Sequence, residues 1–108
     1  MRIAVASSDG VTVNEHFGRA QFFRIYEVNT AASFVETRDA VAACQHSLGH
    51  DETRFDKIIE LISDCEVILV EKIGEGAAAY LIQKNKRVFE VKGAIDKVIE
   101  KLIADKII

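Results

Sequence analysis

The hydrophobic pattern changes its period part-way along the chain, and this change constrains the fold more than any other feature. In residues 21–28 the side chains of Phe23 and Ile25 fall on one face and alternate with Arg24 and Tyr26 on the other. This period of two is typical of a strand. After Thr53, apolar side chains recur every three or four residues, as in a helix. A chain with both periods is expected to pack helices against a sheet.

The complete pattern predicts the order β-β-β-α-β-α-β-α. The expected strands are residues 2–6, 21–28, 33–40, 65–70 and 86–91, and the expected helices are residues 54–63, 76–84 and a final segment from Ile95 to Ile103. A short turn joins the second and third strands, whereas helices separate the later ones. We therefore expect an α/β domain with a mixed five-stranded sheet and helices packed on it, in which the second strand runs antiparallel to the other four.

Size and charge limit the classes of function. The chain has 108 residues, which corresponds to a single domain spanning 1–108, and its formal net charge is −3. No basic surplus is present for nucleic acid or an anionic membrane, and no apolar run is long enough to span a bilayer. Because a signal peptide is also missing, we expect a cytoplasmic protein that binds neither nucleic acid nor membrane.

Three loops, residues 7–20, 41–52 and 71–76, should emerge at one edge of the sheet, where open α/β sheets usually bind ligands. All three histidines lie in the first two: His16 in the first, His46 and His50 in the second, where Cys44 precedes them. Thiolate and imidazole suit iron, copper, zinc and iron–sulfur species. The spacing matches no standard zinc motif, however, and polar loops also collect histidines by chance. Cys65 begins an apolar strand, which favours a buried structural thiol.

Glycines stand in two of these loops. Gly18 is expected to permit a backbone conformation closed to other residues and a close approach to a ligand, and Arg19 offers planar donors to an anion. Gly74 and Gly76 precede a predicted helix, whose backbone N–H groups can also face an anion. The same turn formally matches a dinucleotide-binding pattern, but Glu90 lies inside the next strand and not at its end, which disfavours a nucleotide.

Two carboxylates suggest a different chemistry. Asp9 and Glu71 follow the first and fourth strands, which could be adjacent in the sheet. A pair of carboxylates there could bind Mg²⁺ and support a phosphodiesterase or nuclease. Alternatively, Asp9 and Gly10 form an ordinary turn pair.

Several segments carry a family pattern: Arg-Ile-Ala-Val-Ala-Ser-Ser-Asp-Gly at 2–10, Val-Asn-Glu-His-Phe-Gly-Arg-Ala at 13–20, Phe-Arg-Ile-Tyr-Glu-Val at 23–28, Ile-Gly-Glu-Gly at 73–76 and Val-Phe-Glu-Val-Lys-Gly-Ala-Ile at 88–95. They resemble the dinitrogenase iron-molybdenum cofactor biosynthesis family, which includes NifX-like carriers and the C-terminal domain of NifB-type cofactor synthases. The resemblance implies a three-layer α/β/α fold with a ribonuclease H-like motif, and a non-catalytic role. In this role the domain binds an iron–sulfur or iron-molybdenum cofactor, or its precursor, and passes it between cofactor-synthesising and cofactor-receiving proteins.

The resemblance also implies site residues. His16 matches the histidine of the family's His-Phe-Gly motif, which is a proposed cofactor ligand, and Cys44 falls where synthase-type relatives carry a cysteine. The residues around Cys44 depart from the family pattern, so His46 and His50 stay candidates beside it as metal ligands. We expect His16, Gly18, Arg19, Gly74 and Gly76 to contact the cofactor. A ligand-free protein-interaction module remains an alternative, and a homodimer is compatible with either function.

Overall fold

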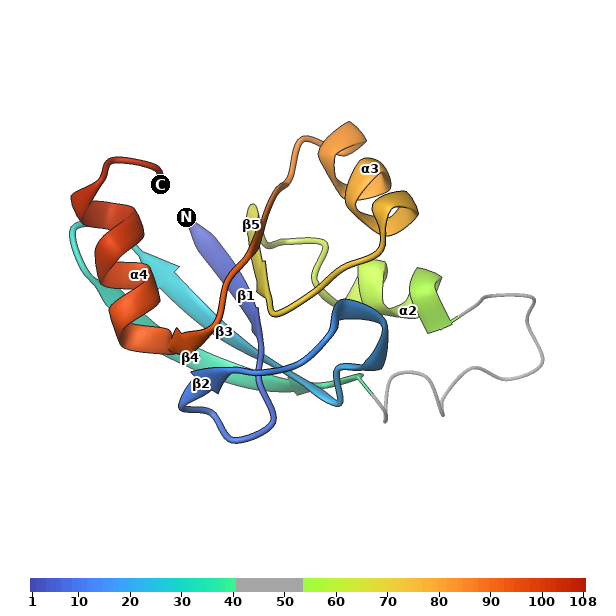
Figure 1. Cartoon of the computed structure of the whole chain (residues 1–108), viewed down its shortest axis with the longest axis horizontal. Helices are drawn as coiled ribbons and strands as arrows, with labels where there is room; N and C mark the ends of the chain where they lie inside the picture. Colours follow the sequence, from blue (N-terminus) through green and yellow to red (C-terminus); the bar gives the residue numbers. More distant parts are fainter. Residues whose placement is uncertain (41–53) are drawn as a thin grey trace.

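The structure is a computed structural model that describes residues 1–40 and 54–108 (Figure 1). Its elements are β1 (Arg2–Ala6), β2 (Thr12–Val13), the 3-10 helix η1 (Phe17–Arg19), β3 (Phe22–Val28), β4 (Ala32–Asp39), α2 (Arg54–Leu61), β5 (Val67–Val70), α3 (Glu75–Gln83), β6 (Arg87–Glu90), β7 (Gly93–Ala94) and α4 (Ile95–Ala104). All the strands and helices expected from the sequence are present, with ends displaced by at most two residues.

Five strands form the main sheet in the order β4-β3-β1-β5-β6. β3 pairs antiparallel with both β1 and β4, whereas β5 pairs parallel with both β1 and β6. β3 is therefore the one strand of this sheet that opposes the other four, as the sequence predicted. The hairpin between β3 and β4 and the helical connections before β5 and β6 produce this mixture of directions.

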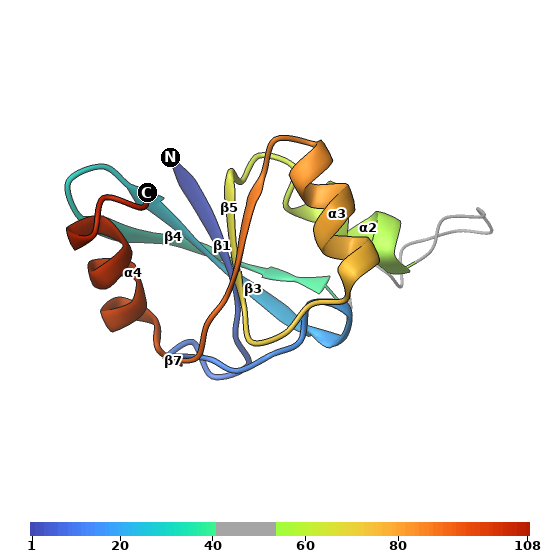
Figure 2. The ribbon, with the colours of Figure 1, turned by 45° about the horizontal axis from the view of Figure 1, so that its top comes forward.

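The sheet separates two apolar cores, because successive side chains of β1 point to opposite faces. Ala4 and Ala6 pack in the core under α2 and α3, which also contains Ile58 and Leu81. Ile3 and Val5 pack on the other face in the core under α4. Figure 2 shows α4 on one side of the sheet and α2 and α3 on the other, which confirms the three expected layers.

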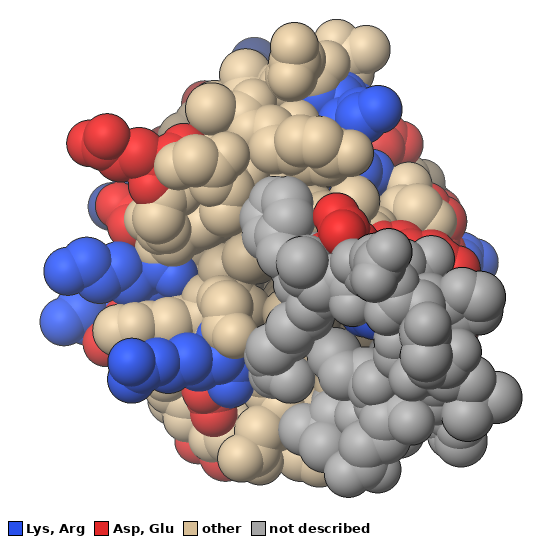
Figure 3. Space-filling model, turned by 90° about the vertical axis from the view of Figure 1, so that its right-hand side faces the viewer, with Lys and Arg blue, Asp and Glu red and all other residues tan. Residues whose placement is uncertain are grey.

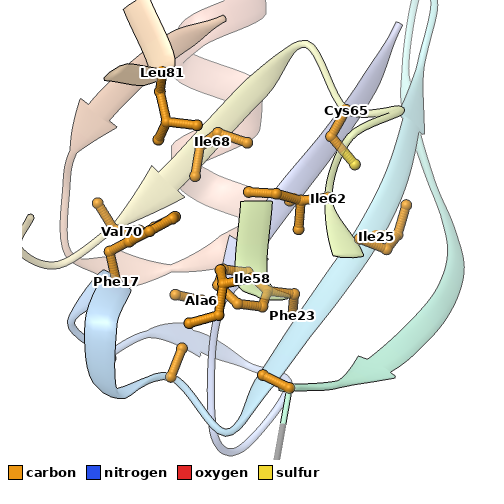
Figure 4. Close-up of a cluster of buried hydrophobic side chains, with 13 residues drawn as sticks. Ala6, Phe17, Phe23, Ile25, Ile58, Ile62, Cys65, Ile68, Val70 and Leu81 are labelled. Atoms are coloured by element: carbon orange, nitrogen blue, oxygen red, sulfur yellow. The ribbon is translucent and has the colours of Figure 1, made fainter. Parts of the chain in front are cut away.

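Cys65 lies in the first of these cores and is fully buried, as expected for a structural thiol (Figure 4). Burial, with a smaller contribution from the neighbouring Asp64 carboxylate, raises the pKa of the thiol to about 12. A thiol in this state does not ionise at neutral pH and is unsuited to binding a metal.

Sequence periodicity missed one part of the fold. β2 and β7 pair antiparallel as a second, two-stranded sheet that ties the loop after β1 to the start of α4. Two-residue strands are too short to show an alternating pattern, so no sequence signal predicts them. Within the part of the chain that the structure describes, no helix is long and apolar enough to cross a membrane.

Candidate functional site

The loops after β1 and β5 lie side by side at the carboxyl ends of these strands. Glu71 donates its backbone N–H to the carbonyl of Glu15 at 3.0 Å, and Phe17 donates its own to the carbonyl of Lys72 at 2.9 Å. Between these bonds, His16 and Lys72 form an isolated parallel bridge. Two of the three loops expected at this edge therefore meet there, and the third lies outside the described residues.

Phe17 anchors the first loop in the protein interior. Its side chain is 1% exposed, and its ring packs edge-to-face on Phe23 with 6.1 Å between the ring centroids. Figure 4 shows Phe17 turned into the core next to Val70. Because Phe17 points inward, its neighbour His16 is held at the surface with an exposed side chain. The backbone N–H of Arg19 closes the short helical turn on the carbonyl of His16 at 3.1 Å.

The two loops enclose a shallow hollow of about 290 Å³, which is lined by His16, Gly18, Arg19, Lys72, Ile73 and Gly74. Arg19 and Lys72 contribute two positive charges, and among the residues that the structure describes no carboxylate belongs to the lining. Figure 3 looks onto the side with α2 and α3, where charges of both signs occur in small groups among uncharged residues. The hollow therefore offers a local anion-binding environment on a protein that is negatively charged as a whole.

A hydrogen bond to the exposed side chain of Glu90 supports the second wall of the hollow. Glu90 is the last residue of β6, so the expectation that it lies inside the strand was wrong, because β6 ends one residue earlier than the sequence predicted. Its side chain accepts the backbone N–H of Ile73 at 3.0 Å. Gly74 then caps α3 without any side-chain hydrogen bond to the first turn. The first backbone N–H groups of a helix have no acceptor within the helix, so this end of α3 carries partial positive charge beside the hollow.

The structure supports the turn interpretation of Asp9. Its carboxylate accepts the backbone N–H groups of Val11 and Thr12, both at 2.8 Å, and the hydroxyl groups of Ser7 and Thr12. The bonds from the Thr12 and Val11 backbone hold the pKa of Asp9 well below its usual range. Among the described residues, no group of three or more His, Cys, Asp or Glu side chains is placed to hold a metal ion.

The glycine prediction requires one correction. Gly18 does not adopt a positive φ angle, whereas Gly10 and Gly93 do, with φ of 74° and 114°. The expectation that Gly18 needs a glycine-only conformation was therefore wrong. A methyl group added to Gly18 would meet nothing within 4 Å, which is the open space that a close approach requires.

The structure brings together four of the five residues expected to contact the cofactor: His16, Gly18, Arg19 and Gly74. Gly76 lies in the first turn of α3, beyond the lining. Cys44, His46 and His50 lie outside the described residues. Sequence reasoning missed Lys72, although its place directly after β5, in a loop expected at this edge, is a usable signal.

Comparison with known proteins gives the family. The model of the family described as "Dinitrogenase iron-molybdenum cofactor" matches residues 1–105. The chain belongs to this family. It is 36% identical over 103 residues to the FeMo cofactor biosynthesis protein NifB of Frankia alni, covering 93% of this chain and 20% of that protein. It is 33% identical over 86 residues to protein NifX of Rhodobacter capsulatus, covering 77% of this chain and 54% of NifX.

The chain covers only part of the length of these relatives. It spans about a fifth of the Frankia alni NifB and about half of NifX. A solved structure, the crystal structure of PH0822, superposes with a TM-score of 0.74 at 24% identity, covering 97% of this chain and 91% of that one. At this identity the superposition establishes the fold, and the function has to be argued from the site.

Proposed function

We propose that this protein binds an iron–sulfur or iron-molybdenum cofactor, or its precursor, at the His16 hollow and delivers it during metallocofactor biosynthesis without catalysing a reaction. One observation carries the proposal. In a chain of the dinitrogenase cofactor family, an exposed imidazole stands in a hollow whose described lining has two cationic side chains and no carboxylate. Cofactor-synthesising and cofactor-receiving proteins are the partners that such a role requires.

The donor set suits an anionic metal–sulfur cluster as cargo. The imidazole of His16 is a good ligand for iron, and Arg19 and Lys72 can offset the charge of the cluster sulfides. The open surface of Gly18 and the uncapped start of α3 at Gly74 leave room and backbone donors beside the imidazole. Because these donors are local, the net charge of −3 does not prevent an anion from binding.

The remaining candidate residues extend this proposal. Gly76 supplies a backbone N–H in the first turn of α3, and Cys44, His46 and His50 are proposed as additional ligands outside the described residues. We further propose that residues 1–108 form a single domain of the ribonuclease H-like type. The order of the five strands and the antiparallel direction of β3 support this assignment.

Anaerobic titration of the purified protein with isolated iron-molybdenum cofactor, and separately with its iron–sulfur precursor, tests the proposal. Absorption and EPR spectra follow binding. His16→Ala should weaken binding at least about tenfold, since a metal–ligand bond is lost. His16 is exposed, so its removal should leave the fold intact. Unchanged affinity in this variant would rule out His16 as the ligand.

A matched pair of lysine variants tests the electrostatic part. Lys72→Ala removes a charge from the hollow, whereas Lys97→Ala removes the same charge from α4, where the side chain is 78% exposed. Only the first should weaken binding. A non-catalytic carrier also returns its cargo unchanged, so cofactor released by denaturation should have the spectra of the cofactor that was added. Altered spectra would instead indicate an enzyme.

A further inference from the structure

The two edges of the main sheet differ in length and cover. β6 has four residues, and its Arg87 donates to the carbonyl of Ile107 in the C-terminal tail. β4 has eight residues, nearly all of them exposed, including Phe34 at 58% and Val35 at 40%. No other strand among the described residues pairs with the outer side of β4. A long, exposed edge strand offers unpaired backbone groups to another strand.

The backbone bonds of the neighbouring residues show which groups of β4 face outward. The Ala40 N–H donates to the carbonyl of Gln21 at 2.8 Å, so Ala40 is turned toward the β3 side. The carbonyl of Phe22, opposite Asp39, accepts from Ser7 and is turned toward β1 instead. Hydrogen-bonded and non-bonded pairs alternate along an antiparallel ladder. The N–H and C=O groups of Thr37 consequently point away from β3, toward the open edge.

We propose that β4 pairs antiparallel with β4 of a second copy of this chain, with the two-fold axis at Thr37. On this axis, each Thr37 exchanges both backbone hydrogen bonds with the partner's Thr37. Glu36 then lies opposite the partner's Arg38, and the symmetry repeats this pairing of opposite charges. An axis one residue earlier would place Glu36 against the partner's Glu36, and one residue later would oppose two Arg38 side chains. Charge complementarity therefore selects the axis at Thr37.

Hydrogen bonds within its own chain already fix the position of the Arg38 guanidinium. Its guanidinium donates to both carboxylate oxygens of Asp64, at 2.6 and 2.9 Å, and to the carbonyl of Leu61 at 2.8 Å. A fourth bond, at 3.4 Å, reaches Glu36 of the same strand. These bonds hold the cation at the edge of the sheet, so little side-chain entropy is lost when a second carboxylate approaches.

The bulge in β4 limits the contact to a short segment. The register with β3 shifts between Ile25 and Tyr26, which leaves Val35 as the extra residue of β4. Regular pairing is then confined to residues near Thr37, and the two-fold axis closes the assembly at two copies. Such a contact is smaller than a standard stable interface, so the dimer should dissociate on dilution. None of the residues that line the His16 hollow lies on β4.

Sedimentation equilibrium from about 10 µM to about 1 mM tests the proposal, because weak dimers populate in this range. The mass should rise from that of the 12.0 kDa chain toward twice that value. Thr37→Pro removes the outward N–H and should weaken dimerisation about tenfold or more. Thr37→Val is the matched control, since both variants lose the hydroxyl bond to Arg24 and only Val keeps the N–H. Equal dimerisation by the two variants, or a mass that stays monomeric in the unmodified chain, would overturn the proposal.

Cross-linking tests the position of the axis. In a Cys44→Ser background, Thr37→Cys places two thiols on the axis, and mild oxidation should yield a disulfide-linked dimer. Ser33→Cys is the control on the same strand, because the two copies of residue 33 would be about 26 Å apart at about 3.3 Å per residue. Efficient cross-linking of the Ser33→Cys variant would refute this register. Thr37→Pro should still bind the cofactor, so failure of the dimer and failure of the cofactor site are separable.

Discussion

Phe17 is the side chain that connects the stability of the fold to the geometry of the site. It is 1% exposed and packs on Phe23 in the core under α2 and α3. Phe17→Ala removes the ring from this core and leaves a cavity. Truncations of this kind cost about 3 to 5 kcal/mol of unfolding free energy. We expect about 3 kcal/mol here, because the exposed loop around Phe17 can partly collapse into the space.

This loss is large for a domain of this size. Native domains have unfolding free energies of about 5 to 15 kcal/mol, and 3 kcal/mol should lower Tm by roughly 10 to 20 °C. Phe17→Leu is the matched control: it keeps most of the apolar contact, loses the edge-to-face geometry and should cost about 1 kcal/mol. Urea unfolding followed by circular dichroism measures both, since the chain contains no Trp for fluorescence.

Phe17→Ala should also weaken the binding of the cofactor. Phe17 holds His16 beside Lys72 through the backbone bond of its own N–H to Lys72. Loosening the anchor should therefore weaken cofactor binding in Phe17→Ala, although Phe17 does not line the hollow. His16→Ala should weaken binding alone and leave the unfolding free energy unchanged. If Phe17→Ala costs less than about 1 kcal/mol, or binds the cofactor as tightly as the unmodified chain, the anchor argument is wrong.

Three other predictions concern the scaffold. Arg38 lowers the pKa of Asp64, so the charged form of Asp64 stabilises the fold above its unfolded pKa of about 3.9. Asp64→Asn should lower the unfolding free energy by about 1 kcal/mol or less at pH 7. The difference between the variant and the unmodified chain should become smaller below about pH 4, which acid unfolding curves would measure. The buried Cys65 thiol, with its pKa raised to about 12, should react with a thiol reagent at pH 8 only after unfolding; a fast native-state reaction in a Cys44→Ser chain would contradict its burial. Gly10→Ala should cost about 1 kcal/mol because Gly10 has φ of 74°, whereas Gly18→Ala should leave Tm nearly unchanged; equal effects would refute the backbone argument.

The sequence predicted the sheet well because its strands are long enough to show their period. β3 alternates over seven residues, and β5 is a continuous buried run. The opposing direction of β3 followed from its hairpin to β4 and from the helical connections of the later strands. β2 and β7 have two residues each and carry no period, so only the structure revealed them.

The site was predictable in part. His16 and Arg19 stand out as an imidazole and a guanidinium in a long loop, and both line the hollow. Lys72 looks like any surface lysine in the sequence and gains meaning only through its bridge to His16. For Gly18 the residue type suggested a special backbone conformation, but the chain uses glycine for that purpose at Gly10.

The sequence by itself determined the local conformations, the two apolar faces of the sheet and the family. Local conformation and the alternation of apolar side chains depend on residues that are close together in the chain. The family depends on the order of residues along nearly the whole chain. The tertiary structure alone decided that Lys72 joins His16 and Arg19 in one hollow and that Thr37 faces an open edge. Both depend on the pairing of strands that are distant in the chain, and that pairing is selected by the packing of the whole core.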